Sequence, residues 1–138
     1  MKVLMAEDLQ PVRDHLSGLL AEVGDVDLRF LWQEAKPLLQ EVEEWRPDAV
    51  ILDISMRGGM ALAVLEEIKK QWPGTAVVIS ASVHHPYFRK AFLSLGADLF
   101  LDKSLDWDDL LAFLLSRKEA IAPAENRRGR DPERKVSL

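Results

Sequence analysis

Short apolar runs alternate with longer amphipathic segments along most of the chain. The short runs are rich in Val, Ile, Leu and Phe and are bounded by turn residues, a pattern typical of β-strands. We expect strands at Lys2–Ala6, Val26–Leu31, Ala49–Ile54, Ala76–Ala81 and Leu99–Leu101. The third and fourth of these are almost continuously apolar, so they should be covered on both faces and lie at the centre of a sheet.

The segments between the strands carry apolar residues at helical spacing. We expect helices at Pro11–Val23, around Leu38–Trp45, around Leu62–Trp72, at Pro86–Leu95 and from Asp106 onward, with Asp106 as the cap. Stop signals follow the first three helices at Gly24, Pro47 and Pro73. This alternation predicts an α/β fold with a parallel sheet, built from about five βα units.

The composition indicates one compact domain followed by a polar tail. The chain has 138 residues, of which 48% are hydrophobic and 30% are charged. We expect the folded domain to cover residues 1–120 and a disordered, basic tail to cover residues 121–138, because the tail has almost nothing to bury. The tail could contact nucleic acid or an acidic partner, although a solvated, solubilising tail is the simpler interpretation.

Charge and cysteine content restrict the classes of function. A formal net charge of -5 argues against non-specific nucleic-acid binding by the domain, and the tail is too short to form a DNA-binding domain. The absence of cysteine excludes disulfides and thiolate metal sites. The apolar start of the chain is too short to span a membrane and, unlike a signal peptide, is interrupted at once by acidic residues. We therefore expect a cytoplasmic protein that binds neither membranes nor DNA directly.

Polar side chains stand at the ends of four of the expected strands. In chain order they are Glu7, Asp8, Asp53, Ser80 and Lys103. Side chains beyond the carboxyl ends of parallel strands meet in a shared crevice where the strand order reverses. Each residue alone could be a helix cap, a solvated turn or a surface lysine. Their common position along successive strands predicts a single site.

Asp53 indicates the chemistry of this site, because it directly follows the apolar run Ala49–Leu52 of a core strand, where an uncompensated carboxylate would be poorly solvated. If Asp8 lies beside Asp53, the two carboxylates repel each other unless a cation is bound. Oxygen ligands without Cys or well-spaced His favour Mg²⁺ over zinc. A carboxylate surrounded by a divalent cation, an ammonium group and a hydroxyl suits phosphoryl transfer. Asp53 would then form an aspartyl phosphate.

These motifs, in this order, resemble the receiver domain of two-component response regulators over about residues 2–116. Glu7 and Asp8 resemble the family's acidic pair, and Asp53 resembles its phosphoacceptor. Ser80 and Lys103 match its Thr/Ser and its lysine. The resemblance implies a stand-alone receiver with a doubly wound, flavodoxin-like fold: a (βα)5 three-layer sandwich whose parallel sheet has the order 2-1-3-4-5.

The resemblance also implies how the metal would be held. Asp8, Asp53 and the backbone carbonyl of Ser55 would bind Mg²⁺. Glu7 would assist the metal through a water molecule. Ser55 and Ser82 stand at positions that tune dephosphorylation in this family.

A second implied group of residues holds the phosphoryl oxygens and reports phosphorylation. Ser80 and Lys103 would contact the oxygens. Phe100, three residues before Lys103, stands at the family's switch aromatic and would turn inward as Ser80 moves toward the phosphoryl group. Plain core packing of Phe100 in its strand is the alternative interpretation.

The chain departs from the family pattern at three positions. Arg57 stands where proline is usual, and Ala61 stands where glycine is usual. Ser104 follows Lys103 where many members have a proline in a cis peptide bond, so we expect no cis bond here. None of these departures removes a group that phosphorylation needs.

The resemblance implies a histidine kinase or a histidine phosphotransfer protein as phosphodonor, and an unidentified protein as downstream target. A homodimer through the fourth helix, fifth strand and fifth helix is a further candidate. As a switch, the protein would catalyse only its own phosphorylation and dephosphorylation. Two alternatives stay open: a pseudo-receiver that binds partners without phosphorylation, and a phosphatase of the haloacid-dehalogenase type. Motif order argues against the phosphatase, because that family has its nucleophile on the first strand.

Overall fold

The computed structural model of the protein describes residues 1–7, 9–31, 35–55, 60–81, 86–102 and 106–121. In this part of the chain five strands alternate with five helices. The strands are β1 (Lys2–Ala6), β2 (Asp27–Leu31), β3 (Ala49–Asp53), β4 (Ala76–Ala81) and β5 (Leu99–Asp102). The helices are α1 (Gln10–Val23), α2 (Ala35–Trp45), α3 (Ala61–Gln71), α4 (Pro86–Ser94) and α5 (Trp107–Ile121).

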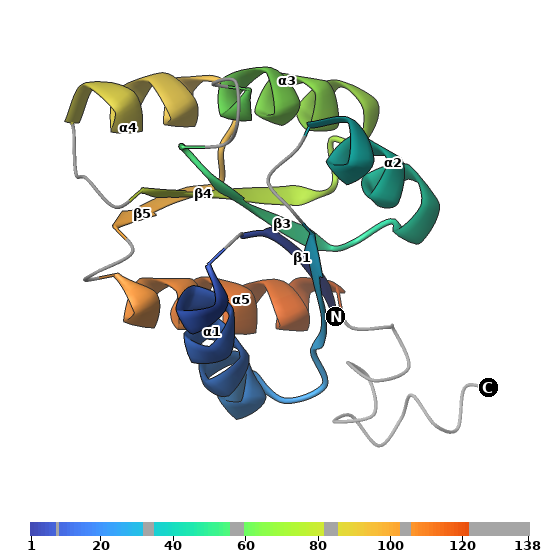
Figure 1. The fold of residues 1–138 in the computed structure, drawn as a ribbon, viewed down its shortest axis with the longest axis vertical. Coiled ribbons are helices and arrows are strands. Elements are labelled where there is room, and N and C mark those ends of the chain that lie inside the picture. The colour runs from blue at the N-terminus through green and yellow to red at the C-terminus, as the bar shows by residue number, and fades with distance from the viewer. Residues whose placement is uncertain (8, 32–34, 56–59, 82–85, 103–105, 122–138) are drawn as a thin grey trace, which may run out of the picture.

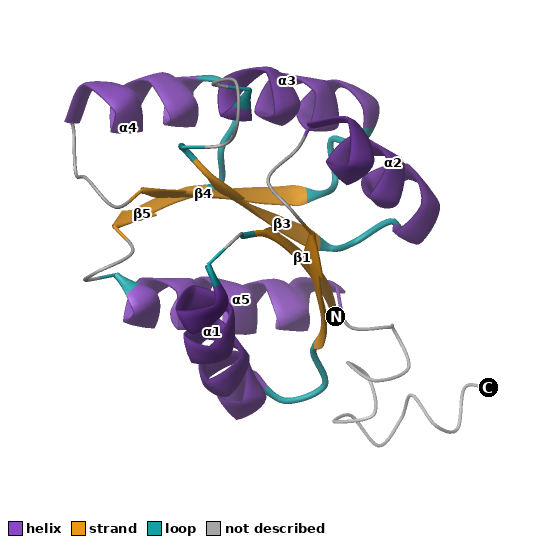
Figure 2. Cartoon of the chain, viewed as in Figure 1, coloured by secondary structure: helices purple, strands orange, loops and turns teal. Residues whose placement is uncertain are grey.

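The strands form one parallel sheet with the order β2-β1-β3-β4-β5. Helices α1 and α5 cover one face of this sheet, and α2, α3 and α4 cover the other (Figure 1). Figure 2 shows the resulting helix, sheet and helix layers. The predicted three-layer, flavodoxin-like fold and its strand order are therefore confirmed. The strand order reverses between β1 and β3, which is where a doubly wound sheet opens a crevice at its carboxyl edge.

Two apolar cores fill the spaces between the layers. One lies under α2, α3 and α4 and includes Leu52 and Ile79, and the other lies under α1 and α5 and includes Ile51 and Val78. Successive residues of a strand point to opposite faces, so each central strand serves both cores. Every residue of β3 and β4 is buried, which confirms that the two continuous apolar runs form the centre of the sheet.

The predicted element boundaries agree with the structure to within a few residues. Gly24 follows α1 with a φ of 73°, as its role as a helix stop requires. The third strand ends at Asp53 and not at Ile54, whose N–H instead donates to the carbonyl of Ser80 across a 2.9 Å bond. Helix α5 runs to Ile121, the first residue of the predicted tail. Residues 122–138 lie outside the described part of the chain, so the tail stays a prediction.

The two ends of α5 are attached to different elements, the first to strand β5 and the last to the C-terminal end of helix α1. Before its first turn, the carboxylate of Asp106 accepts a 2.9 Å hydrogen bond from the N–H of Asp102 at the end of β5. Asp106 thus stands at the predicted cap position, but its carboxylate also bonds to the sheet. In the last turn, the ammonium of Lys118 donates to the carbonyls of Val23 (3.1 Å) and Gly24 (2.7 Å). A cation at the C-terminus of α1 also complements the dipole of that helix.

Replacing either of two glycines by alanine should change the stability of the fold in opposite directions, so the two substitutions form a matched test. Gly96 has a φ of 107°, and an added Cβ would lie 3.2 Å from Cγ of Lys69. Gly18 lies within α1, and an added Cβ would meet nothing within 4 Å. We predict that Gly96→Ala lowers the free energy of unfolding by about 1–2 kcal/mol. Gly18→Ala should raise it by about 0.5–1 kcal/mol, because alanine favours helix. Urea unfolding of both variants tests the pair, and equal effects would contradict it.

Candidate functional site

The strand register brings three of the predicted site residues to one level at the carboxyl edge of the sheet. Asp53 on β3 pairs directly with Ser80 on β4. Met5 pairs with Ile51, so Glu7, two residues beyond Met5, reaches the level of Asp53. The three residues therefore come from neighbouring strands in the order β1, β3, β4. This is the edge and the strand reversal at which the sequence predicted a shared crevice.

Asp53 is almost completely buried, with 3% of its surface exposed. Its Oδ1 accepts two hydrogen bonds from Ser55, one from the backbone N–H (2.8 Å) and one from the hydroxyl (2.7 Å). These two donors hold the carboxylate in one orientation at the end of β3. The sequence predicted a role for the carbonyl of Ser55 but did not predict that its hydroxyl would bind the carboxylate of Asp53.

Glu7 is completely buried. Its N–H donates to the carbonyl of Leu31 on β2 (3.1 Å), and its Oε2 accepts the N–H of Leu9 (3.1 Å). Its carbonyl accepts a 2.7 Å hydrogen bond from Nε of Arg13. Burying a carboxylate is costly unless hydrogen bonds or a positive charge compensate it. The sequence did not single out Arg13, because it stands among polar residues of an amphipathic helix.

Ser80 is also completely buried, and its hydroxyl donates to the carbonyl of Leu52 across a long 3.3 Å bond. The hydroxyl therefore lies against the backbone of β3, the strand that ends in Asp53. A bond of this length is weak, so rotating the hydroxyl toward a group bound at Asp53 would cost little.

Phe100 lies on the opposite side of the sheet from the core under α1 and α5. It is 2% exposed, and its ring centroid lies 6.0 Å from that of Phe92 on α4, with the rings tilted by 41°. Arg89 of α4 donates a 3.0 Å hydrogen bond to the carbonyl of Phe100. The side chain is thus packed inward, an arrangement compatible with both interpretations of Phe100, as a switch and as a core residue. Exposing the ring would cost roughly 1.5–3 kcal/mol.

Several predicted residues lie outside the described part of the chain. They are Asp8, Arg57, Ser82, Lys103 and Ser104. Ala61 is described, and it begins α3 with its side chain buried in the core. Among the residues that the structure describes, no three Asp, Glu or His side chains gather closely enough to hold a metal ion. Two carboxylates at this edge, those of Glu7 and Asp53, are described, and their oxygens are hard ligands of the kind that Mg²⁺ prefers.

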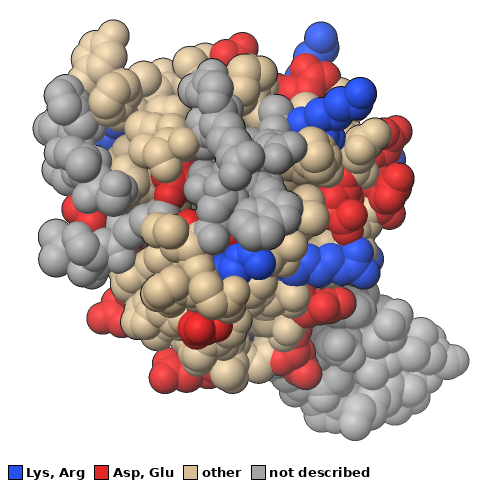
Figure 3. Space-filling view, viewed as in Figure 1, with Lys and Arg blue, Asp and Glu red and all other residues tan. Residues whose placement is uncertain are grey.

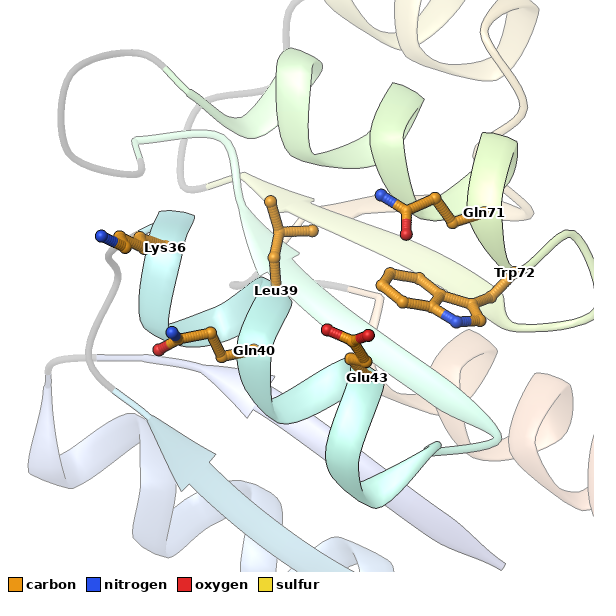
Figure 4. Close-up of a pocket in the computed structure, with 6 residues that line it drawn as sticks. All are labelled: Lys36, Leu39, Gln40, Glu43, Gln71 and Trp72. Carbon is orange, nitrogen blue, oxygen red and sulfur yellow. The ribbon is translucent and has the colours of Figure 1, made fainter.

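A separate pocket of about 330 Å³ lies between α2 and α3, away from this edge (Figure 4). It is lined by Lys36, Leu39, Gln40, Glu43, Gln71 and Trp72. The four residues from α2 recur at helical spacing, so they form the side of α2 that faces α3 (Figure 4). None of the predicted site residues lines this pocket.

Comparison with known proteins relates the chain to one family. The family described as the response regulator receiver domain matches residues 3–115. The transcriptional regulatory protein DltR of Streptococcus agalactiae serotype III (strain NEM316) is 29% identical over 113 residues, which cover 81% of this chain and 49% of DltR. The chain spans about half the length of the curated relatives it matches.

Solved structures share the same fold. The BeF3-activated N-terminal receiver domain of Klebsiella pneumoniae RstA superposes with a TM-score of 0.74 at 23% identity, covering 85% of this chain and 97% of that one. The Mn²⁺-bound form of response regulator Rcp1 gives a TM-score of 0.66 at 20% identity, covering 86% of this chain and 91% of that one. At these identities the likeness supports the fold alone.

The burial of Phe100 generates a stability prediction. We expect Phe100→Ala to lower the free energy of unfolding by about 3–5 kcal/mol, because it removes a buried ring and leaves a cavity beside Phe92. Phe88→Ala is the matched control, because Phe88 is 44% exposed on the same helix as Phe92. It should cost less than about 1 kcal/mol. Chemical denaturation measures both values, and a small loss for Phe100→Ala would show that the ring is not held inward.

Proposed function

Since the chain belongs to the response regulator receiver domain family, we propose that it is a phosphoryl-accepting switch of two-component signalling with Asp53 as phosphoacceptor. As a receiver domain it is a signalling module rather than a catalytic enzyme. One observation carries the proposal: Asp53 ends a central strand, is oriented by Ser55, and lies beside Ser80 in the sheet register. A buried and oriented carboxylate with a neighbouring hydroxyl supports a nucleophilic role.

The proposed reaction transfers one phosphoryl group to Asp53. A carboxylate oxygen forms a bond to phosphorus while the bond between phosphorus and the donor's imidazole nitrogen breaks. That nitrogen keeps the electron pair of the broken bond, and the ring leaves as neutral imidazole because its other nitrogen carries a proton. The hydroxyl of Ser80 and the ammonium of Lys103 would hold the phosphoryl oxygens. Their task is positioning and charge neutralisation, which carry most of the catalysis in phosphoryl transfer.

Receiver domains typically bind a divalent cation, and Rcp1 has been solved in a Mn²⁺-bound form. We propose Mg²⁺ for this chain, bound by Asp8, Asp53 and the carbonyl of Ser55, with Glu7 assisting through water. When bound, the ion would neutralise negative charge on the carboxylates and on the incoming phosphoryl group. The burial of Glu7 and Asp53 supports this assignment, because two buried acids at one edge gain from a nearby positive charge.

The proposed switch joins the phosphorylation site to a partner surface formed by α4, β5 and α5. Ser80 lies beside Leu101 in the register of β4 and β5, next to Phe100. Arg89 joins α4 to the backbone of Phe100. A shift of Ser80 toward a phosphoryl group would therefore disturb β5 and, through Arg89, α4. Phosphorylation would change the relative populations of two arrangements of this surface.

A receiver domain implies a two-component kinase as partner. For this chain we propose a histidine kinase or a histidine phosphotransfer protein as donor, and either an unidentified protein or a second copy of the chain on the α4-β5-α5 surface. Lys and Arg side chains are interspersed with Asp and Glu on the face shown in Figure 3, where the described residues form no extended basic patch. On this face, the mixed charges support output through protein contacts and not through direct DNA binding.

No helix in the described part of the chain has the length and apolar character needed to cross a membrane. We propose that the protein works in the cytoplasm, where its kinase partner would present the phosphoryl group. We also propose that residues 1–120 form the receiver and that the following basic segment is a solvated tail.

The phosphoacceptor is tested by intact mass after incubation with acetyl phosphate and Mg²⁺. We expect the wild-type mass to rise by one phosphoryl group, and the gain to disappear with EDTA. Asp53→Asn should gain nothing, because a carboxamide is a poor nucleophile. Asp102→Asn is the matched control, because Asp102 is also a buried acid (7% exposed) at the carboxyl end of a strand. This control should be modified like the wild type.

Three other outcomes would contradict the proposal. Modification of Asp53→Asn would place the phosphoryl group elsewhere. A wild-type protein that responds neither to acetyl phosphate nor to beryllofluoride would support the pseudo-receiver. Steady hydrolysis of a chromogenic phosphate ester would support the phosphatase, because a switch does not turn over continuously.

A further inference from the structure

The guanidinium group of Arg13 on α1 contacts both Glu7, which follows β1, and the edge strand β2. Its Nε donates a 2.7 Å hydrogen bond to the backbone carbonyl of Glu7. Its Cζ lies 5.1 Å from the centroid of the Phe30 ring on β2. The side chain is half-buried. A guanidinium held by both a carbonyl and an aromatic face has little freedom to move, because both contacts depend on its planar geometry.

Further hydrogen bonds hold the two residues on either side of position 8, Glu7 and Leu9. The N–H of Glu7 donates to the carbonyl of Leu31 (3.1 Å), and the N–H of Leu9 donates to the Glu7 carboxylate (3.1 Å). The N–H of Arg13 in turn donates to the carbonyl of Leu9 (3.1 Å). Arg13 thus binds the backbone on each side of position 8, with its side chain at Glu7 and its own amide at Leu9.

We infer that Arg13 is a positioning residue for metal binding, which fixes the backbone of Glu7 so that the Glu7 carboxylate serves a divalent cation without further ordering. The inference rests on the proposed function, in which Glu7 and Asp8 serve the metal. A ligand whose backbone is already held before binding does not lose that conformational freedom when the cation arrives. Removing a residue that orients metal ligands typically weakens metal binding by about 10–100-fold.

A purely electrostatic role for Arg13 makes the opposite prediction. A positive charge near a cation site repels the cation, so removing the charge would strengthen Mg²⁺ binding. The direction of the change in Mg²⁺ affinity therefore distinguishes a positioning role from simple charge repulsion. A lysine at this position keeps the charge but lacks the planar Nε donor, so it separates the two effects further.

The experiment measures Mg²⁺ affinity by isothermal titration calorimetry at one ionic strength. We expect Arg13→Met to raise the Kd for Mg²⁺ by about tenfold and Arg13→Lys to raise it by a smaller factor. Phe30→Leu, which removes the aromatic face under the guanidinium, should also raise it. Arg29→Met is the matched control. It removes a positive charge from the residue that directly precedes Phe30 on β2, and Arg29 contacts Trp45 and Glu41 instead of Glu7. Its Kd should stay within about twofold of the wild type.

A second measurement follows the turn in metal-free protein. Hydrogen exchange of the Leu9 amide, read by NMR, should be faster in Arg13→Met and Arg13→Lys than in the wild type and Arg29→Met. Tighter Mg²⁺ binding by Arg13→Met, or unchanged affinity and exchange in both Arg13 variants, would overturn the inference while leaving the proposed function intact. A wild-type protein that neither binds Mg²⁺ nor accepts a phosphoryl group would instead refute the proposed function and this inference together.

Discussion

The parallel register of the sheet is the constraint on which the site depends. Because β1, β3 and β4 run in the same direction and pair in register, polar residues that end each strand must come to one edge. Asp53 and Ser80 are direct partners, and Glu7 reaches the same level. A shift of one residue in any pairing would turn the strand's side chains to the opposite face. The apolar cores on both faces resist such a shift, so packing far from the site maintains its geometry.

The buried acids at this edge carry a cost for the stability of the fold. Glu7 is fully buried and Asp53 nearly so, although carboxylates rarely occupy such positions without partners. The structure compensates them with local donors: Ser55 binds Asp53, and the amide of Leu9 binds Glu7. Apolar residues at these positions would need no such donors. Retaining acids here is best understood through the ligand they are proposed to share, and not through the stability of the domain.

The sequence predicted the order of elements and the central strands because continuous apolar runs and helical spacing are strong local signals. It also predicted which edge would hold the site, since residues ending parallel strands share an edge. The hydroxyl bond from Ser55 to Asp53 and the guanidinium of Arg13 could not be predicted, because each depends on the path of a turn and not on spacing along an element. Phe100 was left between two interpretations, and its inward packing against Phe92 is a tertiary contact that no local pattern encodes.

Hydrogen bonds hold helix α5 at both of its ends. Its 15 residues span about 22 Å, from the bond between Asp106 and the end of β5 to the bonds between Lys118 and the C-terminal end of α1. A helix held in this way cannot slide along its axis without breaking the hydrogen bonds at one of its ends. If β5 moved in the proposed switch, its bond to Asp106 would carry the first turn of α5 with it, while the bonds of Lys118 would hold the last turn beside α1. A partner bound at the first turn of α5 would then detect a larger displacement than a partner bound at its last turn.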